Sequence, residues 1–169
     1  MAGSRHTRGA TMTVAQRSLV RSALRGAALW ILAEAVLVFV ARLATRRLDR
    51  GDETSPDIRR ALALRGAQLR PTNPALSRVR VDAVMGGGLL DLTAMAPVVG
   101  GIDVTVRAVM GGMAVRVPAG WKVWWSFRGV MGGLGADDGI RRVTDSARAD
   151  LRVHARAIMG GVGIETPKT

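Results

Sequence analysis

The sequence predicts a mainly β fold: a β-solenoid-like repeat domain of four Met-Gly-Gly units, preceded by a long N-terminal α-helix. Three observations support this prediction. Met-Gly-Gly occurs four times in the second half of the chain, the residues before each copy alternate between apolar and polar, and the first half holds one long apolar segment. Alternation with a period of two is typical of strands that bury one face.

The repeat is longer than its three-residue signature. The copies begin 25, 21 and 28 residues apart, and each follows a Val or Ile that is itself preceded by Ala or Gly. Paired glycines permit a sharp bend, so each unit is predicted as a strand, a glycine corner and a second strand, with equivalent positions stacked. The structural repeat residues are Met85, Gly86, Gly87, Met110, Gly111, Gly112, Met131, Gly132, Gly133, Met159, Gly160 and Gly161.

Stacking predicts a place for each side chain of the unit. The methionines are expected to form an adaptable internal column, next to the small residue that lies two positions before each of them. Asp82 is expected to pair with Arg107 across neighbouring strands. The residues just before the methionines are expected to form an outer apolar ridge, either a candidate interaction surface or a product of ordinary β-propensity: Val84, Val109, Val130 and Ile158.

Tryptophans are concentrated in the third unit. The alternation places Trp121 and Trp125 on one face and Trp124 on the other, so Trp124 is the candidate exposed aromatic. Aromatic side chains are enriched at interfaces, which makes Trp124 a candidate interaction residue. Packing beneath the loop at 136–148 is the alternative.

The first half divides into segments by composition. Residues 1–13 are predicted as a disordered basic tail and residues 14–50 as an apolar helix and membrane anchor. Residues 51–76 are predicted as a short helix, capped by Ser55, followed by a linker with Pro71 and Pro74. The repeat domain is assigned to residues 77–166.

The apolar run at residues 27–41 contains a single polar residue, Glu34. Its helical length of about 22 Å is short for a hydrocarbon core of about 30 Å. Three interpretations remain: a single-pass span, a peripheral helix in contact with membrane lipids, and a soluble oligomerising helix. In a span, Glu34 would mark a contact inside the bilayer, and a slight charge bias places the C-terminal domain on the cytoplasmic side of the cell membrane.

The net charge of +12 is concentrated outside the repeat domain. Residues 1–78 carry +9, whereas residues 79–169 carry only +3 and show no recognised nucleic-acid-binding motif. Nucleic acid is therefore not the expected partner.

The residue types needed for catalysis are sparse. Cysteine is absent, and neither His6 nor His154 has neighbours in the sequence that suggest a metal or base partnership. The pair Asp137-Asp138 stands between glycines, as solvated turns do. No catalytic residue, cofactor or metal is predicted, and the chain is interpreted as a non-enzyme.

The units VDAVMGGGLLDLT, VRAVMGGMAVRVPAGW and FRGVMGGLG resemble the C-terminal domain of the LiaF-like proteins. That family repeats a hydrophobic residue followed by two glycines and carries a Val-Pro-x-Gly element, here Val117-Pro118-Ala119-Gly120. The resemblance covers residues 79–165 and implies a regulator of bacterial cell-envelope stress, often acting through a sensor kinase. The chain departs from the family in having one apolar segment in place of several membrane helices.

Two functions are carried forward. The first is a membrane-attached regulatory or scaffold protein that acts through protein-protein contacts, with a sensor kinase or a second copy of itself as the partner. The alternative is a self-assembling structural protein akin to the bactofilins, in which unpaired terminal strands would allow homo-oligomers to form.

Overall fold

The computed structural model describes residues 32, 36, 43 and 47–167. The continuous range forms a β domain, and all pairings between its named strands are parallel. The strands are β1 (Asp57–Ala63), β2 (Gly66–Leu69), β3 (Arg78–Val84), β4 (Gly87–Asp91), β5 (Ile102–Val109), β6 (Gly111–Arg116), β7 (Lys122–Ala136), β8 (Arg141–Arg142) and β9 (Leu151–Glu165), with the short 3-10 helix η1 (Ser146–Arg148) before β9.

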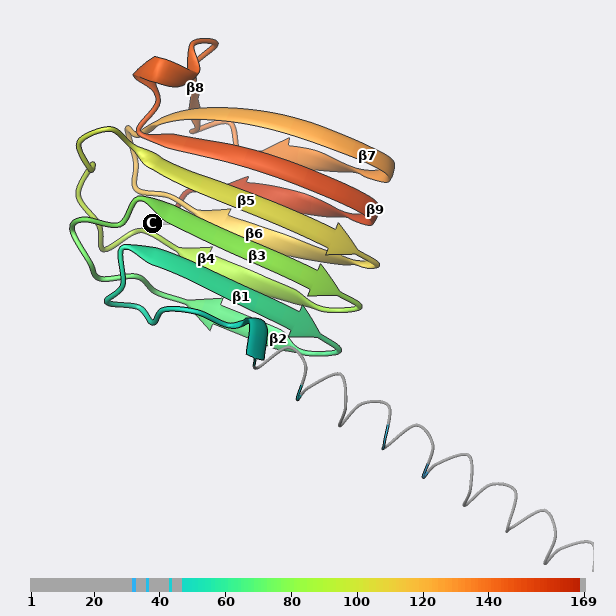
Figure 1. The fold of residues 1–169 in the computed structure, drawn as a ribbon. Helices are drawn as coiled ribbons and strands as arrows, with labels where there is room; N and C mark the ends of the chain where they lie inside the picture. The colour runs from blue at the N-terminus through green and yellow to red at the C-terminus, as the bar shows by residue number, and fades with distance from the viewer. Residues whose placement is uncertain (1–31, 33–35, 37–42, 44–46, 168–169) are drawn as a thin grey trace, which may run out of the picture. The chain divides into compact units, whose positions relative to one another are not determined.

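The chain winds as a stack of rungs, each of which contributes to two facing layers joined by a corner (Figure 1). The first rung is β1 and β2, the second β3 and β4, and the third β5 and β6. β7 and β9 are long strands that run through the corner, so each builds a whole rung by itself.

The spatial order of the last two rungs differs from their order in the chain. β9 pairs with β5 and β6 on one side and with β7 on the other. β7 therefore comes first in the chain but forms the outermost rung, and β9 lies between the third rung and β7. The result is a single parallel sheet folded back on itself at the corners (Figure 1).

The core lies between the two layers and is made of inward-facing residues in register. One row consists of Ile58, Val79, Val104 and Val153, and each of these side chains is fully buried. Burying an aliphatic side chain of this size contributes about 1.5–3 kcal/mol. The predicted alternation of buried and outward-facing residues is confirmed in the burial pattern of β3 and β5.

A column of glycines explains why the repeat needs Gly after Met. A Cβ on Gly111 would overlap the carbonyl oxygen of Gly86 in the rung below. The same overlap would occur from Gly160 onto Gly111, and from Gly132 onto Gly160. The rungs approach so closely at the corner that no side chain fits between them.

Arg65 stands at the matching position of the first rung, because the described part of the chain places no further rung beneath it. Its guanidinium instead contacts Asp49, with 3.1 Å between Arg65 Nη2 and Asp49 Oδ2. Leu64 occupies the position of the methionines, and its φ of 53° matches the values of 49° at Met85 and 54° at Met110. The first rung is thus a further copy of the unit without the signature.

The predicted fold class was wrong. The domain contains five rungs instead of four Met-Gly-Gly units, and its parallel sheet is not stacked in chain order. The part of the chain that the structure describes contains no long N-terminal helix. Most of residues 14–50, Glu34 and the predicted tail at 1–13 lie outside the described residues.

The prediction of a transmembrane helix is not supported. Among the residues described, no helix has the length and apolar character needed to cross a bilayer. The apolar run at 27–41 is itself shorter than a hydrocarbon core.

Residues 51–76, predicted as a short helix and linker, contain β1 and β2. Pairing of all seven residues of β1 with β3 outweighs the helix-capping pattern of Ser55 and Pro56. Ser55 accepts a hydrogen bond from the backbone of Asp52 and so closes a turn before β1. The segment with Pro71 and Pro74 is a loop between two rungs and not the boundary of the domain.

A short segment, residues 47–56, covers the lower edge of the first rung; we call it the cap. Arg50 and Arg59 exchange both backbone hydrogen bonds, at 2.9 and 2.8 Å. Asp49 Oδ1 accepts from the Ala61 amide at 2.7 Å. Arg60 Nη1 donates to the carbonyl of Gly51 at 2.7 Å, so the cap is fixed to β1 through residues 49–51.

Candidate interaction surfaces

The prediction that the methionines form an internal column was wrong. Met85 and Met110 occupy left-handed backbone at the outside of the bend, which directs their side chains into solvent, and about half of each residue is exposed. The residues before them are also on the outside. Together they form one apolar strip, here the corner ridge: Leu64, Val84, Met85, Val109, Met110, Val130, Met131, Ile158 and Met159.

The corner ridge crosses all five rungs. Because neighbouring strands are about 4.8 Å apart, it extends for about 19 Å along the stack. Val130, on the outermost rung, is the most exposed of its members at 81%. A continuous exposed apolar strip of this kind is uncommon on a monomer and is typical of an interaction site.

A column of arginines runs beside the corner ridge on the first layer. Arg107 lies opposite Arg156 in the register, and Arg156 lies opposite Arg128. Arg107 has a carboxylate partner, Asp82, at 4.0 Å, which confirms the predicted pairing. In the region that the structure describes, no carboxylate lies within 4.0 Å of the guanidiniums of Arg128 and Arg156.

The arginines and the corner ridge together line an open groove of about 590 Å³. Its apolar floor is provided by Val109, Val130 and Ile158, and its positive side by the arginine column. Three like charges on adjacent strands repel one another, so an anionic group in this groove would relieve the repulsion. The groove thus combines an apolar contact with a requirement for negative charge.

Trp124 faces outward, but it is half-buried and not freely exposed. Its ring lies 5.2 Å from the ring of His154, centroid to centroid, in a tilted arrangement. Ser126 Oγ lies 3.4 Å from Nδ1 of the same histidine. Trp124 therefore packs on a neighbouring strand, next to the arginine column.

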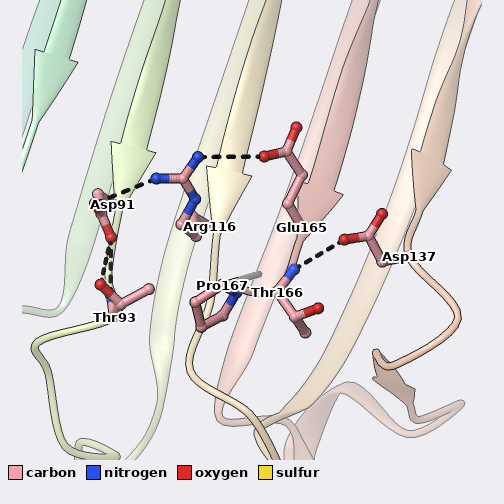
Figure 2. A pocket seen from close by; sticks show the side chains of 7 residues that line it. All are labelled: Asp91, Thr93, Arg116, Asp137, Glu165, Thr166 and Pro167. Atoms are coloured by element: carbon pink, nitrogen blue, oxygen red, sulfur yellow. Dashed lines mark hydrogen bonds and ion pairs between the residues drawn. The ribbon is translucent and has the colours of Figure 1, made fainter. Parts of the chain in front are cut away.

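On the second layer a charged pocket of about 520 Å³ lies at the ends of β4, β6 and β9 (Figure 2). Arg116 stands between two carboxylates: Arg116 Nη1 is 3.7 Å from Asp91, and Arg116 Nη2 is 3.6 Å from Glu165. Figure 2 also shows Thr93 bonded to Asp91 and the amide of Thr166 bonded to Asp137.

The charged residues of this pocket form a row of ion pairs across neighbouring strands, in which Arg116 joins Asp91 to Glu165. The hydroxyl of Thr93, together with Arg116 and Arg70, holds the pKa of Asp91 below its usual value, against the effect of desolvation. A general acid or base works best with a pKa near the working pH, so Asp91 is poorly placed for that role. Within residues 47–167, no three His, Asp or Glu side chains are grouped as metal ligands.

In the described part of the chain, a second strand covers only a short part of the upper end of the stack. β8 pairs only with Lys122 and Val123, so the outer edge of β7 from Trp124 to Ala136, the free edge, has no paired strand in the described part of the chain. Arg142 covers the Trp125 ring at 4.3 Å, and Phe127 leans over Gly129. Ile140 also packs against this end of the core, where Trp125, Phe127 and Leu134 are only partly buried.

The sequence reasoning missed the first rung, the cap and the outward direction of the methionines. A signal for the first rung was present, because Leu64 precedes Met85 by 21 residues, a separation that also occurs between Met110 and Met131. The four ridge residues predicted from sequence do lie on the outer surface, where Val109 is half-buried and the others are exposed.

Comparisons with known proteins give little further information. No protein-family model matches the chain, and no curated protein matches it. Among solved structures, the chain is similar to one described as a "putative cell adhesion protein" from Clostridium sporogenes, with 16% sequence identity and a TM-score of 0.44. The likeness covers 66% of this chain and 56% of that protein, so the chain spans about half of its length.

Proposed function

We propose that this domain is a non-enzymatic protein-interaction domain, with a regulatory or scaffold role, that binds a partner along the corner ridge. The observation that supports the proposal is the juxtaposition of an exposed apolar strip with three stacked arginines. Interface cores combine apolar contacts with arginine, and lysine is rare in them. The groove fits this composition, since the charged residues that line it are all arginines.

The lining of the groove supports a proposal for the chemistry of the partner. A segment that presents apolar side chains to Val130 and Ile158, and carboxylates to Arg128 and Arg156, would satisfy both sides of the groove. The resemblance to the LiaF-like domain adds a setting to the proposal, bacterial cell-envelope stress, and a candidate partner, a sensor kinase.

Site-specific photo-crosslinking in cells tests the proposal. A photoreactive residue at Met159, on the corner ridge, should capture one partner protein, whereas the same residue at the fully exposed Val99 should not. Arg128→Glu with Arg156→Glu should abolish the capture, because the partner's carboxylates lose their counter-charges. The matched control is Arg148→Glu, which changes an exposed arginine that does not line the groove.

Binding of the purified partner then gives the magnitude. Met110→Gln with Ile158→Thr should weaken the affinity by about tenfold or more, since exposed apolar anchors are removed. Val99→Thr should leave it unchanged. Equal capture from Val99, or affinity that is indifferent to the ridge variants, would contradict the proposal.

The second candidate function is a self-assembling structural protein, and the free edge of β7 favours it. An unpaired strand offers backbone donors and acceptors to another chain. Sedimentation of the full-length chain over a range of concentrations tests this candidate. Filaments are the outcome that it expects in its bactofilin-like form, and a monomer at all concentrations is the outcome that excludes it.

A further inference from the structure

The free edge of β7 lacks the features that usually prevent an edge strand from pairing with another chain. Natural edges are protected by lysine, proline, a bulge or a covering segment. From Trp124 to Ala136 there is no proline and only one charged residue, Arg128. β8 protects only the first two residues of the strand.

At the opposite end of the stack, the outer edge of β1 is covered. The cap occupies the outer edge of β1. There Arg50 forms a bridge with Arg59, and the Asp49 carboxylate accepts a hydrogen bond from the Ala61 amide. A second copy therefore cannot place its β7 on the first rung of this one without displacing the cap. Head-to-tail stacking, which would produce a filament, is blocked at this end.

We infer that the free edge pairs with the same edge of a second copy, about a two-fold axis that passes through the corner, and that the product is a closed dimer. In this arrangement the first half of β7 lies antiparallel to the second half of β7 in the other copy. An isologous contact of this kind uses each free edge once and leaves none for further growth.

The inward and outward directions of the side chains select the register. In the first half of β7, Val123, Trp125 and Phe127 face inward, and in the second half Leu134 and Ala136 are paired in register with the buried Val162 and Ile164. Antiparallel pairs keep both residues on one face. An axis between Val130 and Met131 meets this requirement.

This axis pairs Trp125 with Ala136 of the second copy, and Phe127 with its Leu134. The cores of the two stacks would then meet at Phe127 and Leu134, while the Trp125 ring keeps its cover of Arg142 at the border of the interface. The pairing begins where β8 ends, so the contact between β8 and Lys122 and Val123 is kept.

The outward-facing pairs are also complementary. Arg128 would lie against Gly133 of the second copy, and Ser126 against its Gly135. A Cβ on either glycine would meet no atom within 4 Å, so there is open space where the longer side chains would rest. Large residues in the first half thus meet small residues in the second, and no like charges face each other.

This inference does not rest on the proposed use of the corner ridge, and it narrows the second candidate function from a filament to a dimer. The natural chain contains no cysteine, so introduced thiols can report the pairing. In the full-length chain, Ser126→Cys with Gly135→Cys should give a covalent dimer on mild oxidation, because directly opposed residues lie within disulfide reach.

Three controls belong to the crosslinking. Ser126→Cys alone and Gly135→Cys alone should remain monomeric on non-reducing gels, since neither position faces itself across the axis. Val99→Cys should behave in the same way. Covalent dimers from a single cysteine, no covalent dimer from the pair, or a ladder of higher multiples would each overturn the proposal.

A charge pair gives a second readout that does not depend on oxidation. Ser126→Lys with Gly135→Lys should weaken the dimer by about tenfold or more in sedimentation equilibrium, because the two ammonium groups would face each other. Ser126→Asp with Gly135→Lys should restore it. Identical behaviour of the two double variants would overturn the register. Neither variant changes a ridge residue, so partner capture at the corner ridge is tested separately.

Discussion

The two ends of the stack are built from the same kind of rung but present opposite surfaces. Interior rungs repeat Val and Ala at their inward positions, for example Val81, Val106 and Ala155 in one row. At the lower end that row finishes with Arg60, and at the upper end with Phe127. Arg60 fixes the cap by its hydrogen bonds, whereas Phe127 leaves an apolar end beside a bare strand edge.

The difference shows how a repeating fold encodes its ends. Between two rungs an inward position holds a small or aliphatic side chain, but in a terminal rung, which has a neighbouring rung on one side only, the same position can hold a larger one. At the lower end these positions hold charged side chains that bind the cap. At the upper end they hold aromatic side chains beside glycines, which suits pairing with another chain.

The glycine column gives the largest expected contrast between an end and the middle. Gly111→Ala should destabilise the domain by about 3 kcal/mol or more, because its Cβ would overlap the carbonyl oxygen of Gly86 and the rungs would have to separate. Arg65→Ala, at the equivalent position of the first rung, should cost about 1 kcal/mol or less, from a partly exposed ion pair. Urea unfolding measures both. Equal losses would show that the close approach is not what selects glycine.

The cap should be weaker than the stack that it covers. Asp49→Ala removes the acceptor for the Ala61 amide, at 2.7 Å, and the partner of Arg65. A lost buried hydrogen bond costs about 1–3 kcal/mol. Hydrogen exchange should become faster in β1, with protection in β5 and β9 retained. Asp138→Ala, in an exposed turn, is the control, and unchanged exchange in β1 would mean that Asp49 does not hold the cap.

Several features of the fold were predictable because they depend on local pattern. The alternation identified the strand before each Met-Gly-Gly corner and the strand after two of them, and equivalent positions gave the pairing of Asp82 with Arg107. The order of the rungs was not predictable in the same way. β9 and β7 carry similar units, and the clue that separates them is the bulk of Phe127, which stands opposite Ala155. Only the terminal position has room for it.

The candidate surfaces were predictable in part. The residues of the outer ridge follow from period-two alternation, which puts Val84 and Val130 on the side opposite the core. The outward direction of Met85 and Met110 does not follow from the alternation, because it depends on a left-handed backbone conformation that the sequence pattern does not reveal. The first rung was missed because Arg65 replaces the expected glycine, and that replacement follows from a missing neighbour.

The smallest expected effect lies in the middle of the stack, away from both ends. Arg152 Nε and Nη2 donate to the two oxygens of Asp103 at 2.7 and 3.0 Å, and so join the third rung to β9. This hydrogen bonding lowers the pKa of Asp103 below its usual value despite partial desolvation. A carboxyl group with a lowered pKa in the folded state stabilises the fold above its unfolded pKa and loses that contribution as the pH falls through the folded value.

Asp103→Asn should therefore cost about 1 kcal/mol or less at pH 7, because the carboxylate is well exposed and solvent screens the pair. The difference between variant and natural chain should begin to shrink as the pH falls below the ordinary aspartate pKa of about 4, and it should vanish once the pH is below the lowered pKa of folded Asp103. Urea unfolding at a series of pH values measures this convergence, with Asp138→Asn as the control. Because both partners lie between the ends, the difference should not depend on protein concentration, unlike any effect of the free edge. A difference that persists at low pH would mean that the carboxylate's charge is not what Arg152 stabilises.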